Sequence, residues 1–232
     1  MSAVPETRRA SIAHFDAIAA RWEESPTRMA IARAVADAIL TLLPPSGVGH
    51  AMEFGAGTGL VTALLAPAAR QLTAVEQSPG MITAMRRKLD EHGIGNVQAV
   101  EGDVEQQLPA GPFDLVFSSM TLHHIADVPA LFERVHEVLA PGGRIAMADL
   151  LSEDGSFHGP EVPGVMHHGF GVDELAGWLR TSGFIDIAVR EVHRIRRVRE
   201  DGTQREYPVL LATGRKSGTD LSGFVFGCHG RA

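Results

Sequence analysis

The chain has few of the features that mark secreted, membrane-spanning or cysteine-rich metal proteins. Cysteine occurs once among 232 residues, as Cys228, so the chain can form no intrachain disulfide and no multi-cysteine metal cluster. The longest nearly apolar run, residues 60–66, is far shorter than the roughly 18 residues that a membrane span needs. Charged residues occupy the start of the chain, where a secretory signal would have an apolar core. We therefore expect a cytoplasmic protein with no membrane contact.

Basic residues are outnumbered by acidic ones, 21 to 28, which gives a formal net charge of −7. A net negative charge opposes binding to a phosphate backbone unless the basic residues cluster. The arginine-rich run at residues 190–199 contains no aromatic side chain that could stack on a base. We therefore expect no nucleic-acid partner.

Helical and strand-like segments alternate along the chain, which is typical of a parallel sheet covered by helices. Helical spacing runs over residues 11–43 and is interrupted at Ser25-Pro26. Five strands are expected: one ending at Phe54, then 71–75, 97–100, 113–118 and 144–150. Residues 184–193 and 207–213, with a turn at Asp201-Gly202, are expected to form an antiparallel hairpin. The predicted fold is α/β, a doubly wound, mostly parallel sheet of seven strands.

Composition suggests how the chain is divided. Residues 1–46 are expected to form an N-terminal helical cap or lid, and residues 47–215 the α/β domain. Within that domain, residues 151–172 are rich in Gly, Pro and His without periodicity; loops of this length are usually functional, so we expect a second lid. Residues 216–232 contain four glycines and no periodic pattern, and we expect a disordered tail.

A glycine-rich turn, Gly55-Ala56-Gly57-Thr58-Gly59, directly follows the first predicted strand and opens a helix. Glycines let the backbone turn sharply and approach a ligand closely, and the helix N-terminus offers unpaired N–H groups. Glu53 precedes the turn, and Glu76 ends the second strand 19 residues after Gly57. A carboxylate at that place can accept hydrogen bonds from both hydroxyls of a ribose. Since Leu60 replaces the third Gly or Ala of a nicotinamide fingerprint, a nucleoside carrying a cation is the expected ligand.

At these residues the sequence resembles the class I S-adenosylmethionine-dependent methyltransferases, whose first motif is an acidic residue followed by x-G-x-G-x-G. The resemblance covers roughly residues 15–215. Four further segments carry it, in order: the acidic strand end at Glu76, Glu101-Gly102-Asp103-Val104, Phe113-Asp114-Leu115-Val116 and Leu139-Ala140-Pro141-Gly142-Gly143. The resemblance implies a Rossmann-like methyltransferase domain with N-terminal lid helices. It also implies S-adenosylmethionine as cofactor and a small-molecule methyl acceptor.

The resemblance further implies a set of cofactor-binding residues: Glu53, Gly55, Gly57, Gly59, Glu76, Gln77, Asp103, Val104, Ser118 and Ser119. Glu53 would hold the ammonium group, and the glycines of the turn would approach the methionine and ribose through their backbone. Glu76, with Gln77 beside it, would bind the ribose hydroxyls. Asp103 and Val104 would bind the amino group and the ring of adenine, while the two serines would line the methionine.

Histidines supply candidate bases for those acceptors that must lose a proton. His123 and His124 follow the fourth predicted strand, and His167 and His168 lie in the second lid. All four are candidate catalytic residues, and the lid pair is expected to contact the acceptor; packing is the competing interpretation for His124. His123, His158, His167 and His168 could converge on a metal, but no HxH or HxxxH pair lies on a regular element, so we expect none.

The acceptor atom stays open among a hydroxyl, a thiol and an activated carbon, because acceptor identity depends on loops and not on the fold. Ser118-Ser119-Met120-Thr121 is unlike the Asn-Pro-Pro-Tyr pattern of amino methylation. A nicotinamide-dependent oxidoreductase is disfavoured, because Tyr207 is the only tyrosine and no Tyr-x-x-x-Lys pair exists. A non-catalytic cofactor-binding regulatory protein remains an alternative, and the oligomeric state, monomer or homodimer, is open.

Overall fold

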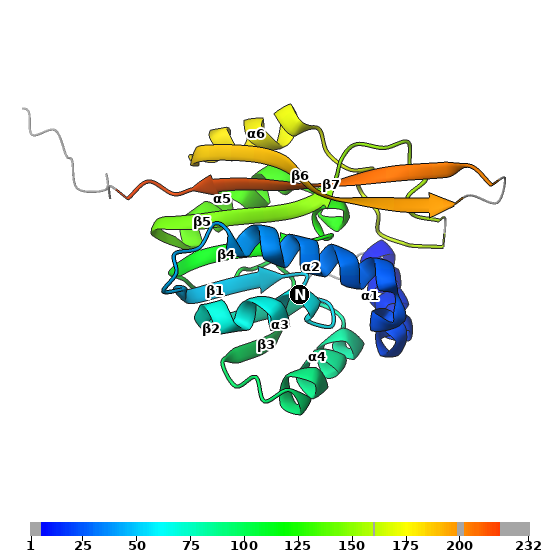
Figure 1. The fold of residues 1–232 in the computed structure, drawn as a ribbon, viewed down its shortest axis with the longest axis horizontal. Coiled ribbons are helices and arrows are strands. Elements are labelled where there is room, and N and C mark those ends of the chain that lie inside the picture. The colour runs from blue at the N-terminus through cyan, green and yellow to red at the C-terminus, as the bar shows by residue number, and fades with distance from the viewer. Residues whose placement is uncertain (1–5, 160, 199–201, 219–232) are drawn as a thin grey trace, which may run out of the picture.

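The computed structural model describes residues 6–159, 161–198 and 202–218. A central sheet is covered by helices on both faces (Figure 1). Its strands are β1 (Val48–Phe54), β2 (Ala69–Glu76), β3 (Val97–Glu101), β4 (Phe113–Ser119), β5 (Leu139–Leu150), β6 (Ile185–Val198) and β7 (Gln204–Arg215). The helices are α1 (Glu6–Ile18), α2 (Pro26–Leu40), α3 (Leu60–Leu65), α4 (Pro79–Glu91), α5 (Val128–Val138) and α6 (Val172–Thr181). Short 3-10 helices are η1 (Ala19–Glu24), η2 (Ala66–Ala68) and η3 (Leu122–His124).

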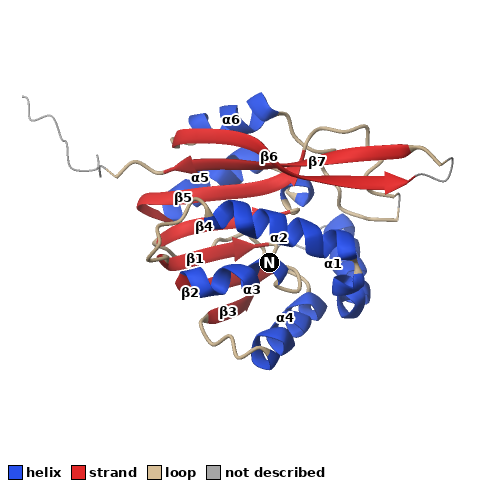
Figure 2. Ribbon diagram, in the orientation of Figure 1, coloured by secondary structure: helices blue, strands red, loops and turns tan. Residues whose placement is uncertain are grey.

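The seven strands lie in the order β3-β2-β1-β4-β5-β7-β6. Strands β1 to β5 are parallel, whereas β7 runs antiparallel to both of its neighbours (Figure 2). The chain winds outward from β1 to β3 and then returns to place β4 beside β1. Ligands of open α/β sheets bind at the carboxyl ends of the strands, where the winding reverses. The predicted doubly wound fold is confirmed.

Two apolar layers hold the helices to the sheet. On one face, Val35 and Ile39 of α2 are fully buried against the strands, together with α3 and part of α4. On the other face, Leu131 and Val135 of α5 are fully buried, together with apolar residues of α6. Strands covered on both faces need apolar residues in succession, which is why β4 is an almost continuous apolar run.

Strand β5 is longer than its predicted range of 144–150, and two helix ends are set by local contacts. Strand β5 begins at Leu139 and includes Pro141-Gly142-Gly143, because Lys216 N donates to Gly143 O at 2.8 Å and Lys216 O accepts from Gly142 N. Helix α3 ends at Leu65, and η2 follows it. The N-cap of α6 is Gly171, whose N–H donates to Glu174 Oε2 at 3.0 Å.

The hairpin of β6 and β7 is also longer than its apolar pattern indicates. Residues 195–198 pair with residues 204–207, beyond the end of β5. Charged side chains are frequent in this extension and follow no strict alternation, so hydrophobic periodicity gives no signal for it. In Figure 1 the extension and α1 lie at the same end of the molecule. Asp201 of the predicted turn lies outside the described residues, as do residues 219–232 of the predicted tail.

Helix α1 lies across the carboxyl ends of the parallel strands (Figure 1). Asp16 near its end accepts hydrogen bonds from Ser78 Oγ at 2.5 Å and Gly80 N at 2.8 Å, which ties α1 to the start of α4. In the part of the chain that is described, none of the helices combines the length and apolar character required to cross a bilayer.

Candidate active site

A cavity of about 570 Å³ lies at the carboxyl ends of the central strands. The turn after β1 forms one wall. Phe15, Ile18 and Trp22 of α1 and η1 cover it, and the η3 histidines lie along another wall. Cavities of roughly 300–1,000 Å³ that combine apolar walls with a few polar groups are typical of small-molecule sites. The predicted N-terminal lid residues therefore do contact this space.

The glycine turn brings backbone to the cavity wall. Gly55 and Gly57 have φ of 62° and 56°, a left-handed conformation that favours glycine. A Cβ on Gly55 would overlap the side chain of Thr121. A Cβ on Gly57 would meet no atom nearer than Trp22 Nε1, at 4.0 Å, because this glycine borders the open cavity. Gly59 lies just outside the wall, as the N-cap of α3.

Glu53 is a buried carboxylate at the cavity wall. Its side chain accepts a hydrogen bond from Thr62 Oγ1. Burial raises its pKa to about 8, against the lowering effects of the Thr62 hydrogen bond and the charge of Lys88. A ligand cation beside Glu53 would favour the ionised form, since opposite charges stabilise each other most where water is excluded. The site therefore fits a ligand with an ammonium or sulfonium group.

Glu76 at the end of β2 supports the glycine turn. Its carboxylate accepts from Gly57 N at 2.9 Å, Gln77 N at 2.7 Å and Ser78 N at 2.9 Å. Burial raises the pKa of Glu76, and these three hydrogen bonds oppose the rise. A carboxylate has about four acceptor positions, so about one remains for a ligand hydroxyl. Glu76 and Gln77 both line the cavity, as their predicted ribose role requires.

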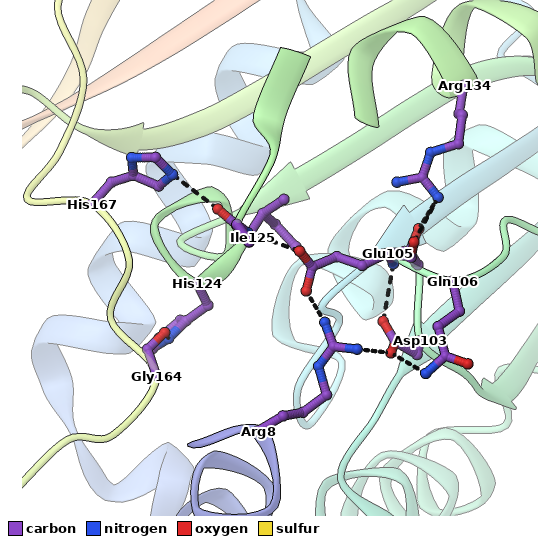
Figure 3. A network of polar contacts seen from close by, with 11 residues as sticks. Arg8, Asp103, Glu105, Gln106, His124, Ile125, Arg134, Gly164 and His167 are labelled. Carbon is purple, nitrogen blue, oxygen red and sulfur yellow. Dashed lines mark hydrogen bonds and ion pairs between the residues drawn. The ribbon is translucent and has the colours of Figure 1, made fainter. Parts of the chain in front are cut away.

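The carboxylate of Asp103 is occupied by side chains of the protein itself. Arg8 of α1 donates to the carboxylates of both Asp103 and Glu105, and Gln106 Nε2 donates to Asp103 at 2.8 Å (Figure 3). Val104 lines the cavity, whereas Asp103 does not. Its predicted bond to adenine would therefore require Arg8 to move or the carboxylate to be shared.

Of the two serines at the end of β4, only Ser119 lines the cavity. Ser118 is fully buried and donates its hydroxyl to Phe54 O at 2.8 Å, whereas Ser119 lines the cavity. Ser118 therefore joins β4 to β1, and its predicted cofactor contact would be indirect.

His123 of η3 is paired with Asp149, a buried carboxylate near the end of β5. His123 Nδ1 lies 2.8 Å from Asp149 Oδ1, and both side chains are at most 2% exposed. Burial would raise the pKa of Asp149, but the charge and hydrogen bonds of His123 outweigh burial and lower it. His123 Nε2 lies 3.0 Å from Nε2 of His158, which comes from the loop after β5. Both histidines line the cavity.

His124 also lines the cavity, beside this pair. Its Nδ1 donates to Gly164 O at 2.8 Å (Figure 3), and its ring meets Phe15 edge-on at 5.4 Å. Burial, with the charge of His123, lowers the pKa of His124 to about 4. Burial, with the charges of His123, His124 and Arg197, lowers the pKa of His158 to about 3. Neutral imidazoles therefore face the cavity at physiological pH.

His167 and His168, the predicted lid pair, lie away from the cavity wall. His167 Nε2 donates to Ile125 O at 2.9 Å, which fixes the loop onto η3 (Figure 3). The side chain of His168 is 61% exposed, with Nδ1 3.8 Å from Glu153 Oε1. Both catalytic assignments stay predictions, but the geometry favours the histidines of η3 and His158.

Sequence reasoning missed two arginines in the cavity wall. The Arg28 guanidinium stacks on Trp22 at 3.7 Å, and that of Arg197 stacks on Phe157 at 4.0 Å. Neither forms an ion pair with a carboxylate among residues 6–159, 161–198 and 202–218. Arg197 belongs to the hairpin extension, and only the length of that extension brings it to the cavity.

Comparison with known proteins agrees with the motifs. Residues 52–147 match the family model of a methyltransferase domain. An uncharacterized methyltransferase of Bacillus pumilus is 34% identical over 145 residues, which cover 60% of this chain and 64% of that protein. A ubiquinone biosynthesis O-methyltransferase of Xanthomonas axonopodis is 30% identical over 156 residues, which cover 61% of this chain and 64% of that protein. The match thus spans less than two thirds of either relative.

Solved structures show the same fold. A complex of DhpI with SAH has a TM-score of 0.69 at 24% identity, covering 91% of this chain and 97% of that one. The YcgJ protein of Bacillus subtilis has a TM-score of 0.64 at 14% identity, covering 80% of this chain and 99% of that one. The family model shows that residues 52–147 match a methyltransferase domain, and the solved structures show that the chain shares their fold; both agree with the ordered motifs of the class I S-adenosylmethionine-dependent methyltransferases.

Proposed function

We propose that this chain transfers a methyl group from S-adenosylmethionine to the hydroxyl or thiol of a small, anionic acceptor. The observation that carries the proposal is the polarity of one cavity. A buried carboxylate, Glu53, lies in the wall at the glycine turn, and neutral histidines lie in the wall formed by η3 and the loop after β5.

The glycine end of the cavity is suited to the cofactor. Glu53 offers a negative charge to the ammonium group, and Glu76 offers its remaining acceptor position to the ribose. Val104 and Gln77 complete the wall on the adenosine side. Bound there, the cofactor supplies an activated methyl group on a positively charged sulfur, so the protein has mainly to position the acceptor.

The histidine end is suited to an acceptor that must lose a proton. A neutral imidazole can accept a proton, and such general bases contribute roughly 10²–10⁴ to rates. His124 and His158 are held neutral by burial, and the carboxylate of Asp149 lies 2.8 Å from Nδ1 of His123, which orients that ring. Phe15, Ile18 and Trp22 cover this space and exclude water.

The arginines indicate the charge of the acceptor. Arg28 and Arg197 both line the cavity, and burial together with Arg197 lowers the pKa of Arg28. Each guanidinium donates to a backbone carbonyl, Arg28 to Trp22 O and Arg197 to Phe157 O, but neither has a carboxylate partner among the described residues. Their remaining donors favour a carboxylate, phosphate or similar anion on the bound molecule, because Arg presents paired donors to such groups.

A methyl-transfer screen with paired acceptors tests this function. Hydroxy acids and mercapto acids are compared with their neutral esters, and the demethylated cofactor is measured. We expect turnover with an anionic acceptor, and Arg197→Ala should raise its KM at least about tenfold, the loss of roughly one charged hydrogen bond. Arg196→Ala is the matched control, because Arg196 is exposed on the same strand and paired with Glu206. Equal turnover of acids and esters would contradict the anionic acceptor, and no turnover with any acceptor would favour a regulatory, non-catalytic protein.

A further inference from the structure

We propose that His123, His124 and His158 form a binding site for a divalent cation of the zinc class, at the acceptor end of the cavity. One ring nitrogen of each histidine lies within 4.8 Å of one ring nitrogen of the other two. His123 and His124 come from η3, and His158 comes from the loop after β5. The use of such a cation in methyl transfer rests on the proposed function, whereas the site itself does not.

The spacing of the nitrogens is close to that of a metal site. Two nitrogens at the usual Zn–N length of about 2.0–2.1 Å, at a tetrahedral angle, lie roughly 3.3 Å apart. His123 Nε2 and His158 Nε2 are 3.0 Å apart. A small outward movement of His158, on a loop, would admit an ion between them. A hydrogen bond between the two rings is the competing explanation for this distance.

Two of the three rings are already oriented as metal-bound histidines usually are. A ligating histidine typically donates its other ring N–H to a carboxylate or a backbone carbonyl, which fixes the tautomer and the ring plane. His123 Nδ1 faces Asp149 at 2.8 Å, and His124 Nδ1 faces Gly164 O at 2.8 Å. In each ring, Nε2 is therefore the nitrogen left to bind a ligand.

The charge of the site is compatible with a cation. A metal ion binds the deprotonated nitrogen of an imidazole, so binding to these three rings competes with their protonation. Asp149 supplies one negative charge behind His123, while Arg197 opposes a cation on the His158 side. Three imidazole nitrogens suit Zn²⁺, Co²⁺ or Ni²⁺ better than Mg²⁺ or Ca²⁺, which prefer oxygen ligands.

A site with three protein ligands has an open coordination position. Catalytic zinc sites keep this arrangement, whereas structural sites are closed by a fourth protein ligand. The three histidines all line the cavity, so the open position faces the acceptor space. An acceptor hydroxyl or thiol bound there would lose its proton more readily, since a cation lowers the pKa of groups that coordinate it. The cation would then replace a histidine as the means of activating the acceptor.

Titration with Co²⁺ and Zn²⁺ tests the site without any acceptor. Chelator-treated protein without an affinity tag is titrated with Co²⁺, and its visible absorption and stoichiometry are recorded. We expect one tightly bound Co²⁺ per chain, displaced by Zn²⁺. His158→Ala should weaken Co²⁺ binding at least about tenfold, because loss of even a supporting residue outside the ligand set typically costs 10–100-fold. His168→Ala is the matched control: it removes an exposed histidine of the same loop and should leave binding unchanged.

Asp149→Asn is a second test of the site. It should weaken Co²⁺ binding about 10–100-fold although all three histidine ligands remain. Calorimetric binding of S-adenosylhomocysteine shows that each variant is folded. The proposal is overturned if the parent binds no Co²⁺, or if His158→Ala binds it as well as the parent does. If the parent binds no Co²⁺ and methyl transfer proceeds undiminished in the presence of chelator, the cation site is refuted and the proposed function stands.

Discussion

Glu53 is the residue whose surroundings conflict most with its charge. Its ordinary pKa of 4.5 rises to about 8 on folding, because burial penalises the ionised form. Since the folded protein binds this proton more tightly, its stability is full below about pH 4.5 and falls as the pH rises toward 8. The difference amounts to about 3 kcal/mol at pH 7. Such a cost is tolerable at a functional site, where the carboxylate is needed for a charged ligand.

Glu53→Gln should therefore stabilise the ligand-free protein above pH 7 and weaken the binding of S-adenosylmethionine. The amide keeps the shape of the side chain and can still bond to Thr62, but it carries no charge. Urea unfolding at pH 5, 7 and 8.5 should show the parent losing stability with rising pH and the variant losing less. If the two pH profiles run parallel, Glu53 does not carry the buried proton.

Glu76 has a different role, because its hydrogen bonds shape the turn as well as the ligand site. Glu76→Ala should reduce cofactor affinity about thirtyfold, corresponding to roughly 2 kcal/mol for a buried charged acceptor. Glu101→Ala is its matched control, since Glu101 lies beside Glu76 in the sheet register but is exposed. Calorimetry with S-adenosylhomocysteine gives both values. Equal affinities for the two variants would place the ribose away from β2.

At the scale of elements, α1 is attached to the α/β domain by charged contacts. Arg8 bridges Asp103 and Glu105 (Figure 3). Asp16 accepts hydrogen bonds from Ser78 and from the backbone of α4. No residue of α1 is fully buried, so these polar contacts matter more than apolar packing. Elements held in this way open at low free-energy cost, which suits a lid that must release product.

Arg8→Ala should loosen α1 without unfolding the domain. Amide hydrogen exchange should become faster in α1, and the dissociation rate of S-adenosylhomocysteine should rise, while exchange in β1 and β4 stays unchanged. Arg9→Ala is the control, because Arg9 is exposed on the same helix. Unchanged exchange in α1 after loss of Arg8 would mean that Asp16 and the apolar contacts suffice to hold the helix.

The sequence predicts best those elements whose structure depends on residues that are close together in the chain. The glycine turn, Glu76 and the apolar run of β4 depend on neighbours a few residues away, and all lie where predicted. The hairpin extension with Arg197 depends on pairing between two charged segments, for which hydrophobic periodicity has no signal. His158 reaches the cavity from a loop, and its contact with His123 spans 35 residues of sequence. Such contacts are set by the tertiary fold.

At the scale of the whole molecule, the two ends of the cavity have opposite preferences. The glycine end offers the carboxylates of Glu53 and Glu76, and the other walls offer two guanidiniums and the histidines, with Glu161 of the loop after β5 as a further carboxylate. Burial of His124 and His158 disfavours their protonated forms, so stability should decline as the pH falls from about 6.5 toward their lowered pKa values of about 4 and 3. Glu53 acts in the opposite direction, because its raised pKa lowers the stability as the pH rises.

Stability of the ligand-free protein should therefore pass through a maximum between these two effects, in the mildly acidic range. Thermal unfolding followed from pH 4 to pH 9 measures the profile. In His124→Asn the acid limb should become shallower while the alkaline limb is retained. A parent profile that rises steadily up to pH 8 would contradict the raised pKa of Glu53.

Calorimetric titration of the parent protein with S-adenosylmethionine tests the central claim most directly. The cavity combines the glycine turn, Glu53 and Glu76, so we predict saturable binding of one molecule per chain with a Kd on the order of micromolar, or about −8 kcal/mol. The same protein should bind nicotinamide dinucleotides far more weakly, because Leu60 replaces the small residue of their fingerprint. Tight binding of a dinucleotide, with no heat from S-adenosylmethionine, would contradict the assignment of this cavity.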